Sequence, residues 1–512
     1  MKLNQRKSGA ILTYVQIILS NTISLIYTPF ALRMLGQSQY GLFGTAGSFT
    51  SYLSLLGLGI GGAYIRWNAK YRATNDIEGE RRLNGLFFTI FSIISVVTLL
   101  VGIGLLFVAP YVFGNSFTES ELHDLLILIF LSVLNTALTF FMTPIFSCIQ
   151  SYEKFLILRI VGLCSIILTP ILNIIALLAG GKAVTLQIIT FILSVITFII
   201  YYIYAIKVLK MKFIFRGFTS GLLKEILLFS SFIFMNTIAT LISDTTDSVI
   251  LAAVAGASAV SVYTIGHNFQ NYFSQLSTAV SSVFAPQINM LVAKENNDEV
   301  LTKLMLKVGR IQFYITSLII IGFIFFGKPF ILLWAGEDYG DSYIIALLLM
   351  FASFVPLFQN VGLEIQKAKN KHKARTIVYF LVAIINIGLT IPFTIWWGGI
   401  GAVFATFLCC VFGQAIFMNF YYHKGIGLNM IYFWKNILKI IPSFIPAILV
   451  GILFNTIISV NSVWMFLIGV ISLLAVYIIS IWFISMTQQE KDIFAKPIKS
   501  IIYKIAKRKT KE

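Results

Sequence analysis

The sequence predicts an all-α membrane protein that crosses the bilayer fourteen times. Of its 512 residues, 58% are hydrophobic and only 11% are charged, whereas a soluble domain contains about 25% charged residues. The mean hydropathy of the chain is +0.89. Fourteen crossings of about 20 residues each would use most of the apolar residues, so this composition leaves little material for a soluble domain.

Apolar runs that are separated by charged, glycine-rich or proline-rich breaks define the expected helices. The first run, 9–32, is too long for the apolar core of a signal peptide, which has about 7–15 residues, and therefore counts as a span. In chain order the expected spans are 9–32, 40–65, 85–109, 125–147, 160–178, 184–206, 226–252, 260–290, 312–334, 343–365, 377–397, 400–421, 440–459 and 463–486.

Lysine and arginine sort to one side of these spans. With the N-terminus inside, all of the 38 basic residues except Arg33, Lys182 and Lys328 fall in inside segments, as the positive-inside rule requires. An even number of spans then places both termini in the cytoplasm. The basic tail, 491–511, is expected to lie against anionic lipid headgroups, so the net charge of +18 needs no nucleic-acid partner.

Several kinds of site are excluded by residue spacing. Gly57, Gly59 and Gly62 form a GxGxxG pattern, but they lie in an apolar span with no preceding strand, which excludes a dinucleotide site and indicates close helix packing. The four cysteines and four histidines lack the spacing of metal ligands. The sequence has no Walker A motif, so the energy for its activity is not expected to come from ATP bound to this chain. No catalytic residue, metal or bound cofactor is expected.

The sequence contains an internal repeat at an offset of about 215–220 residues. It covers six consecutive spans, so both copies enter the membrane in the same direction and are related by an axis along the membrane normal. The predicted regions are an N-lobe at 1–206, a C-lobe at 207–421, two additional spans at 422–486 and a basic tail at 487–512. The matched positions are Asn21 and Asn236, Gly36 and Gly256, Pro110 and Pro329, Gln150 and Gln366, and Arg159 and Arg375.

Three segments carry a resemblance to a known family. They are PFALRMLGQSQYGLF at 29–43, LGLGIGGA at 56–63 and GGIGAVFAT at 398–406. The chain resembles the bacterial polysaccharide-biosynthesis flippases of the multidrug/oligosaccharidyl-lipid/polysaccharide exporter superfamily. The resemblance implies two six-helix lobes in a V around a central cavity, plus two C-terminal helices. It also implies an activity, the movement of undecaprenyl-diphosphate-linked oligosaccharide across the bacterial cytoplasmic membrane.

The same resemblance implies a secondary transporter rather than an enzyme, coupled to a proton or sodium gradient. Its partners are the lipid-linked substrate, membrane lipids and other polysaccharide-assembly proteins. Two alternatives belong to the same superfamily: a drug/cation antiporter, which normally has twelve spans, and a flippase for the peptidoglycan lipid precursor, which is expected to have a more cationic cavity. An oligosaccharide polymerase or ligase is a third hypothesis, but such enzymes are expected to carry a large outer loop, which this sequence lacks.

Polar residues recur at helical spacing inside spans one, two, four, seven and eight, and such residues face a water-filled path or another helix. Spans seven and eight carry the candidate site residues. Asp244 and Asp247 are the only acidic residues well inside a span, and His267 is expected at a similar depth. Together they form a candidate proton or sodium site, although a structural acid–imidazole pair is the competing interpretation. The candidate substrate-binding residues on these two spans are Asn236, Thr240, Asn271 and Gln275.

Three basic residues are candidates for binding the diphosphate of the substrate. Arg33 breaks the charge rule and lies in the segment that carries the resemblance. Arg66 follows span two on the inside, and Lys328 lies toward the outer end of span nine. Cations at these positions would suit a diphosphate group. Each could instead anchor its helix at the membrane interface.

Overall fold

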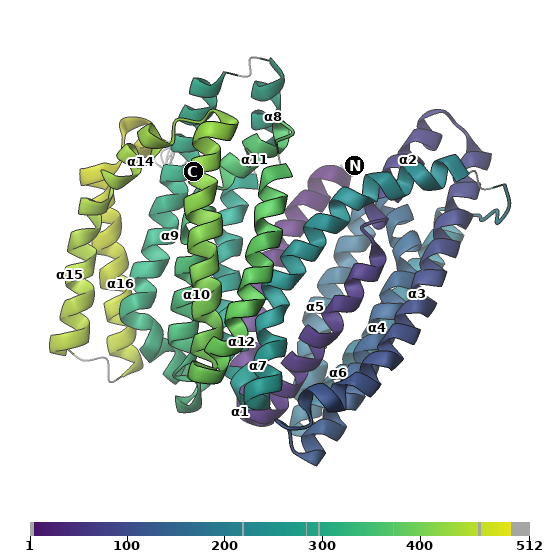
Figure 1. Cartoon of the computed structure of the whole chain (residues 1–512), viewed down its shortest axis with the longest axis horizontal. Coiled ribbons are helices and arrows are strands. Elements are labelled where there is room, and N and C mark those ends of the chain that lie inside the picture. The colour runs from purple at the N-terminus through teal and green to yellow at the C-terminus, as the bar shows by residue number, and fades with distance from the viewer. Residues whose placement is uncertain are drawn as a thin grey trace, which may run out of the picture. The chain divides into compact units, whose positions relative to one another are not determined.

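The computed structural model of the chain describes residues 5–217, 220–282, 284–294, 297–371, 373–458 and 462–492. Within these residues all regular structure is helical and no strand occurs (Figure 1). Eleven of the described helical stretches are long and apolar enough to cross a membrane. The prediction of an all-α polytopic membrane protein is therefore confirmed.

One compact unit consists of Met1–Ile265 and Ala383–Ala405. Within it, α4 packs against α1, α3 and α6, and α5 packs against α1 (Figure 1). The elements that begin in this unit are α1 (Gln5–Ser51), η1 (Tyr52–Gly57), α2 (Gly61–Ala73), α3 (Ile77–Phe113), α4 (Glu119–Ser151), α5 (Phe155–Leu178), α6 (Ala183–Ile203), η2 (Tyr204–Val208) and α7 (Ser220–Ser282).

The second unit consists of Gly266–Val382 and Thr406–Glu512, so the two units divide within α7 and α12. Its central element is α9, which packs against α10, α14, α15 and α16. The lobe boundaries expected at 206 and 421 stay predictions. The remaining elements are α8 (Ala285–Lys294), α9 (Asp298–Ala335), η3 (Glu337–Tyr339), α10 (Ser342–Phe358), α11 (Asn360–Ala368), α12 (Lys373–Cys409), η4 (Cys410–Phe417), α13 (Met418–Tyr421), η5 (Tyr422–Ile426), α14 (Met430–Leu438), η6 (Ile441–Phe444), α15 (Ile445–Leu453), η7 (Phe454–Ile458), α16 (Val463–Ser480) and η8 (Ile481–Ser485).

Three long helices contain a glycine in a non-helical conformation. Gly36 in α1 has φ 72°, Gly256 in α7 has φ 79° and Gly398 in α12 has φ 58°. Glycine reaches positive φ readily because it has no Cβ atom. Each kink falls where the sequence predicts the break between two successive spans, so these pairs of spans are joined by a kink instead of a loop.

The internal repeat is visible in the backbone. Gly36 and Gly256 adopt similar positive φ angles in corresponding helices. Glu153 and Asn370, which follow the fourth and tenth expected spans, also have nearly equal positive φ angles of 55° and 54°. Similar backbone hydrogen bonds close the two turns around these residues. Equivalent turns at the predicted offset indicate that the two halves of the chain use the same local structure.

The second span differs from the single helix expected at 40–65. α1 ends at Ser51, a short 3₁₀ turn follows, and Leu58 and Gly59 have φ angles of 48° and 67° before α2 begins. The glycine-rich sequence has little preference for helix, which favours this break. A Cβ atom at Gly57 would lie 2.6 Å from the ring of Phe140 in α4, so the close packing indicated by the glycines is present.

A buried ion pair fixes the chain segment that follows the last span of the second unit. The Arg310 Nε atom of α9 lies 2.5 Å from the Glu490 carboxylate, and these side chains are only 11% and 4% exposed. Arg310 also donates hydrogen bonds to the backbone oxygens of Asn436 and Ser485. One guanidinium group therefore connects α9 with α14, with the end of the final span and with the segment beyond it.

Candidate functional site

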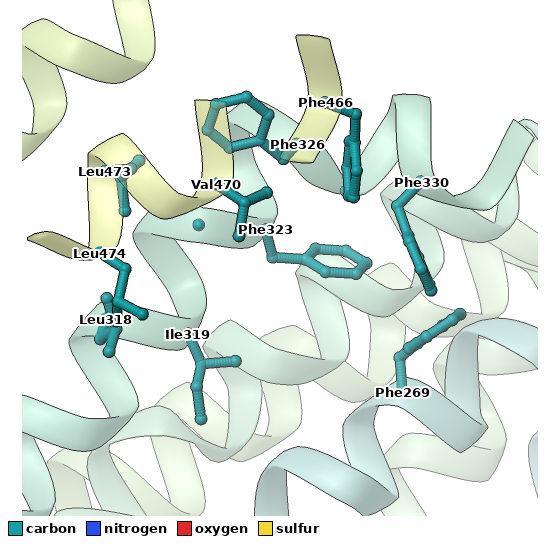
Figure 2. A pocket seen from close by; sticks show the side chains of 12 residues that line it. Phe269, Leu318, Ile319, Phe323, Phe326, Phe330, Phe466, Val470, Leu473 and Leu474 are labelled. Atoms are coloured by element: carbon teal, nitrogen blue, oxygen red, sulfur yellow. The ribbon is translucent and has the colours of Figure 1, made fainter. Parts of the chain in front are cut away.

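The second unit contains an apolar groove with a volume of about 290 Å³. Figure 2 shows aromatic rings and branched aliphatic side chains around it, which come from α7, α9 and α16. Gly322 and Gly327 of α9 complete the wall, and a Cβ atom at Gly322 would meet no atom within 4 Å. The lining residues are Phe269, Leu318, Ile319, Gly322, Phe323, Phe326, Gly327, Phe330, Phe466, Val470, Leu473 and Leu474.

Aromatic contacts give one end of the groove a fixed shape. The ring of Phe269 lies 5.8 Å from the rings of both Phe323 and Phe330, and Phe330 stacks on Phe466 at 6.0 Å (Figure 2). Edge-to-face and offset-stacked rings at such distances stabilise one another. Because no lining side chain is polar, the groove suits a hydrocarbon chain and offers nothing to bind a sugar or a phosphate.

The first unit contains a polar cluster around Asp247 of α7, which is 1% exposed. The carboxylate accepts hydrogen bonds from Thr390 at 3.2 Å and from Tyr263 at 3.4 Å. The Asn386 side-chain oxygen lies 3.3 Å from the same Thr390 hydroxyl group and competes with Asp247 for its single proton. Carboxylate, hydroxyl and amide oxygens are the ligands that hard cations prefer, so this cluster has the chemistry of a proton or cation site.

A second polar contact lies next to this cluster. The hydroxyl groups of Tyr52 and Thr246 are 2.9 Å apart, and Thr246 directly precedes Asp247 in α7. This contact joins the segment that follows α1 to α7 beside the buried carboxylate. The polar surroundings of Asp247 therefore come from three segments that are far apart in the sequence.

The partners of Asp247 were missed by the sequence analysis, although one signal for them exists. Asn386, Thr390 and Thr394 are polar residues spaced four apart in α12, and all three are buried. That spacing places them on one face of the helix. This polar stripe in an apolar span is the same kind of signal as the one in α7. Nothing in the sequence, however, indicates that it packs against Asp247.

The predicted residues on the seventh and eighth spans have different outcomes. Asn236, Thr240 and Asp244 occur in α7, but their side chains lie outside the described residues. Asn271 shares a hydrogen bond with His267 Nδ1 at 3.2 Å, and Gln275 is exposed. Asp247 and His267 belong to different units, so their predicted meeting stays a prediction.

Two of the three predicted basic residues, Arg33 and Arg66, directly follow expected spans, and Lys328 lies in the outer part of the ninth, 312–334. Arg33, Arg66 and Lys328 are all exposed. The Arg66 guanidinium lies 5.2 Å from the centre of the Trp67 ring, a distance at which a cation is attracted to an aromatic face. Arg33 lies three residues before the kink at Gly36. Their role in binding an anionic substrate stays a prediction.

Comparison with known proteins gives one family match and several solved structures of similar fold. The family model "Polysaccharide biosynthesis protein" matches residues 6–292, and no curated protein sequence matches. The structure of a lipid II flippase, MurJ in an inward closed conformation, aligns with a TM-score of 0.70 and 18% identity over 96% of this chain and 99% of that one. A multidrug resistance MATE family transporter of the MOP superfamily, in an inward-facing conformation, aligns with a TM-score of 0.59 and 14% identity over 82% of this chain and 98% of that one.

Proposed function

The chain belongs to the polysaccharide biosynthesis protein family, and from this premise we propose that it is a flippase for lipid-linked oligosaccharides. The proposed substrate is an undecaprenyl-diphosphate-linked repeat unit of O-antigen, capsule or exopolysaccharide. The protein would move it across the bacterial cytoplasmic membrane by alternating access. In this role the chain is a secondary transporter and breaks no covalent bond in its substrate.

The observation that carries this proposal is the wholly apolar groove of the second unit. Moving a lipid-linked sugar requires an apolar surface for the lipid chain as well as a polar path for the headgroup. The groove supplies such a surface, since burial of hydrocarbon contributes about 0.8 kcal/mol per CH₂ group. A transporter of small hydrophilic substrates has no need of it.

The predicted basic residues would serve the other end of the substrate. Arg33, Arg66 and Lys328 are exposed cations at or near the ends of expected spans. Arginine can donate two parallel hydrogen bonds to a phosphate group, and lysine can act as a point charge beside it. We assign them to the diphosphate at the two mouths of the path, with Asn271 and Gln275 along it.

The Asp247 cluster is the proposed site of ion coupling. A carboxylate within a span is costly and marks an ion or proton path in many transporters. Protonation or sodium binding at Asp247 would change the charge beside Tyr263 and Thr390, which come from different helical segments. Such a change could alter how these segments pack, and so link an ion gradient to substrate movement.

We further propose fourteen crossings, with two lobes of six spans around a central path and both termini in the cytoplasm. Support comes from the three kinked helices, since α1, α7 and α12 each contain a glycine with positive φ at the expected break between two spans. When each of these three helices counts as two spans, the eleven candidate spans become the fourteen crossings that the sequence predicts. The turn at Glu153 recurs at Asn370, which supports two repeated lobes.

The proposal is tested by filling the groove. Gly322→Leu should place a branched side chain in the space where the lipid chain would lie, because a Cβ atom there meets nothing within 4 Å. We expect flipping of an undecaprenyl-diphosphate-linked oligosaccharide in proteoliposomes to fall about tenfold or more, since a blocked apolar subsite loses several CH₂ contacts. Flipping is measured as the rate at which the sugar of the substrate becomes accessible to a lectin added outside the proteoliposomes.

Gly104→Leu is the matched control. Gly104 is an exposed glycine within α3 whose Cβ atom also meets nothing within 4 Å, but it does not line the groove. This variant should flip the substrate at the parental rate. Equal flipping by both variants would contradict the groove assignment. Flipping of a drug cation or of the peptidoglycan lipid precursor, with no flipping of the oligosaccharide, would favour one of the two alternatives within the superfamily.

A further inference from the structure

The short helix α14 has the pattern of a helix that lies at the membrane interface. Met430, Phe433 and Ile437 form its buried face, whereas Ile431 and Leu438 are 72% and 52% exposed. Lys435 and Lys439 are exposed beside these apolar side chains. A helix with exposed apolar residues flanked by lysine lies at the boundary between headgroups and acyl chains.

A pocket of about 440 Å³ opens beside this helix, between α9, α14 and residues 487–490. Lys303 and Lys307 of α9 occupy one side, Tyr432 and Asn436 of α14 another, and Thr487 a third. A neighbouring pocket shares Lys303 and Tyr432 and also contains Asp298 and Glu299, of which Asp298 forms an ion pair with Lys369. If α14 lies at the interface, the pocket beside it is at the level of the lipid headgroups.

The charges around the pocket leave an excess of positive charge. Arg310 is neutralised by Glu490, and the exposed Lys303 lies 2.6 Å from Glu299. Lys307 is exposed and has no hydrogen-bond or ion-pair partner among the residues that the structure describes. An exposed pair such as Lys303 and Glu299 contributes little and exchanges readily, so both lysines could bind an incoming phosphate.

We propose that this pocket binds the headgroup of an anionic phospholipid of the cytoplasmic leaflet. Lys303 and Lys307 would bind the phosphate, while the hydroxyl groups of Tyr432 and Thr487 would donate hydrogen bonds to a glycerol headgroup. The acyl chains would lie along the exposed Ile431 and Leu438. The site connects three segments of the second unit, so a bound lipid would stabilise their packing. It is independent of the transported substrate.

The test uses the full-length protein after removal of endogenous lipid. Dioleoylphosphatidylglycerol and dioleoylphosphatidylcholine are titrated separately, and lipid retained on the protein is counted by native mass spectrometry. We expect tighter retention of phosphatidylglycerol. The double variant Lys303→Gln/Lys307→Gln should bind it more weakly, by about fivefold per lysine, the value that corresponds to about 1 kcal/mol for each basic residue near an anionic surface. Lys303→Arg/Lys307→Arg should keep the binding.

The control variant is Lys70→Gln/Lys294→Gln, which removes two exposed lysines that do not line the pocket. It should retain phosphatidylglycerol as the parent does. The proposal would be overturned by unchanged retention in Lys303→Gln/Lys307→Gln, by equal retention of phosphatidylcholine, or by an equal loss in the control, which would indicate general attraction to the basic face. Loss in both the Gln and the Arg variants would show a packing defect and would also overturn it.

Discussion

Glu490 and Asp247 are carboxylates that the fold buries beside different partners. Burial raises the pKa of Glu490, but hydrogen bonds from Arg310 and from the Thr487 backbone outweigh it and lower that pKa below its ordinary value of 4.5. The stability contributed by the pair is therefore fully present above pH 4.5 and is lost as the pH falls through the lowered value. Asp247 accepts hydrogen bonds from hydroxyl groups, which suits a group that exchanges a cation.

At the scale of this residue, Asp247→Asn should separate ion coupling from packing. Asparagine keeps the shape and can still accept a hydrogen bond from Thr390, but it carries no charge. We expect the variant to reach the membrane at parental abundance and to lose the dependence of transport on an imposed proton or sodium gradient. The measurement is substrate-driven ion flux in proteoliposomes over a series of pH values.

Asp341→Asn is a suitable control for this experiment, since Asp341 is exposed just before α10. It should couple transport to the gradient as the parent does. Parental coupling in Asp247→Asn would instead mean that the cluster around Asp247 is structural. The ion site would then have to lie elsewhere in the chain.

At the scale of helices, close approach of backbones explains why glycine is needed at some positions and not at others. The helix that follows the Gly36 kink packs against the first residues beyond the Gly256 kink. A Cβ atom at Gly41 would lie 1.8 Å from the Ala257 backbone oxygen, whereas one at Gly47 would meet nothing within 4 Å. Both glycines are in the same helix, so they form a matched pair.

Gly41→Ala should destabilise the protein, because forcing a methyl group into a packed contact costs about 1–3 kcal/mol. Gly47→Ala should stabilise it by about 0.5–1 kcal/mol, since alanine is the better helix former. The measurement is the apparent melting temperature of each purified variant in one detergent. If Gly41→Ala melts at or above the temperature of Gly47→Ala, the two segments do not approach as closely as this packing requires.

At the scale of the whole molecule, the distribution of basic residues predicts a definite topology. Reporter fusions placed after helix ends test it, because each fusion reports the side of the membrane on which the helix emerges. If any one fusion reports the side opposite to the one expected below, the proposed fourteen crossings or their orientation is contradicted. Fusions after Gly114, Ala335 and Ser462 should report the outside, and fusions after Asn75, Gly217 and Asn370 should report the inside.

The sequence by itself determined the features that depend on local composition and spacing. Low charge and long apolar runs specified a helical membrane protein because the backbone must satisfy its own hydrogen bonds in lipid. The repeat offset located Gly256 from Gly36, since a kink with positive φ favours glycine wherever it occurs. The acidic residue Asp247 also stood out from sequence alone, because a carboxylate in an apolar span is rare.

Only the tertiary structure decided which distant residues meet. Thr390 reaches Asp247 across 143 positions of the chain, and Phe269, Phe330 and Phe466 meet in one groove from three helices. Helical periodicity shows which side chains share a face, but the rotation of each helix and the neighbour it packs against depend on how all side chains fill space together. The cluster and the groove are products of that packing, which no single segment encodes.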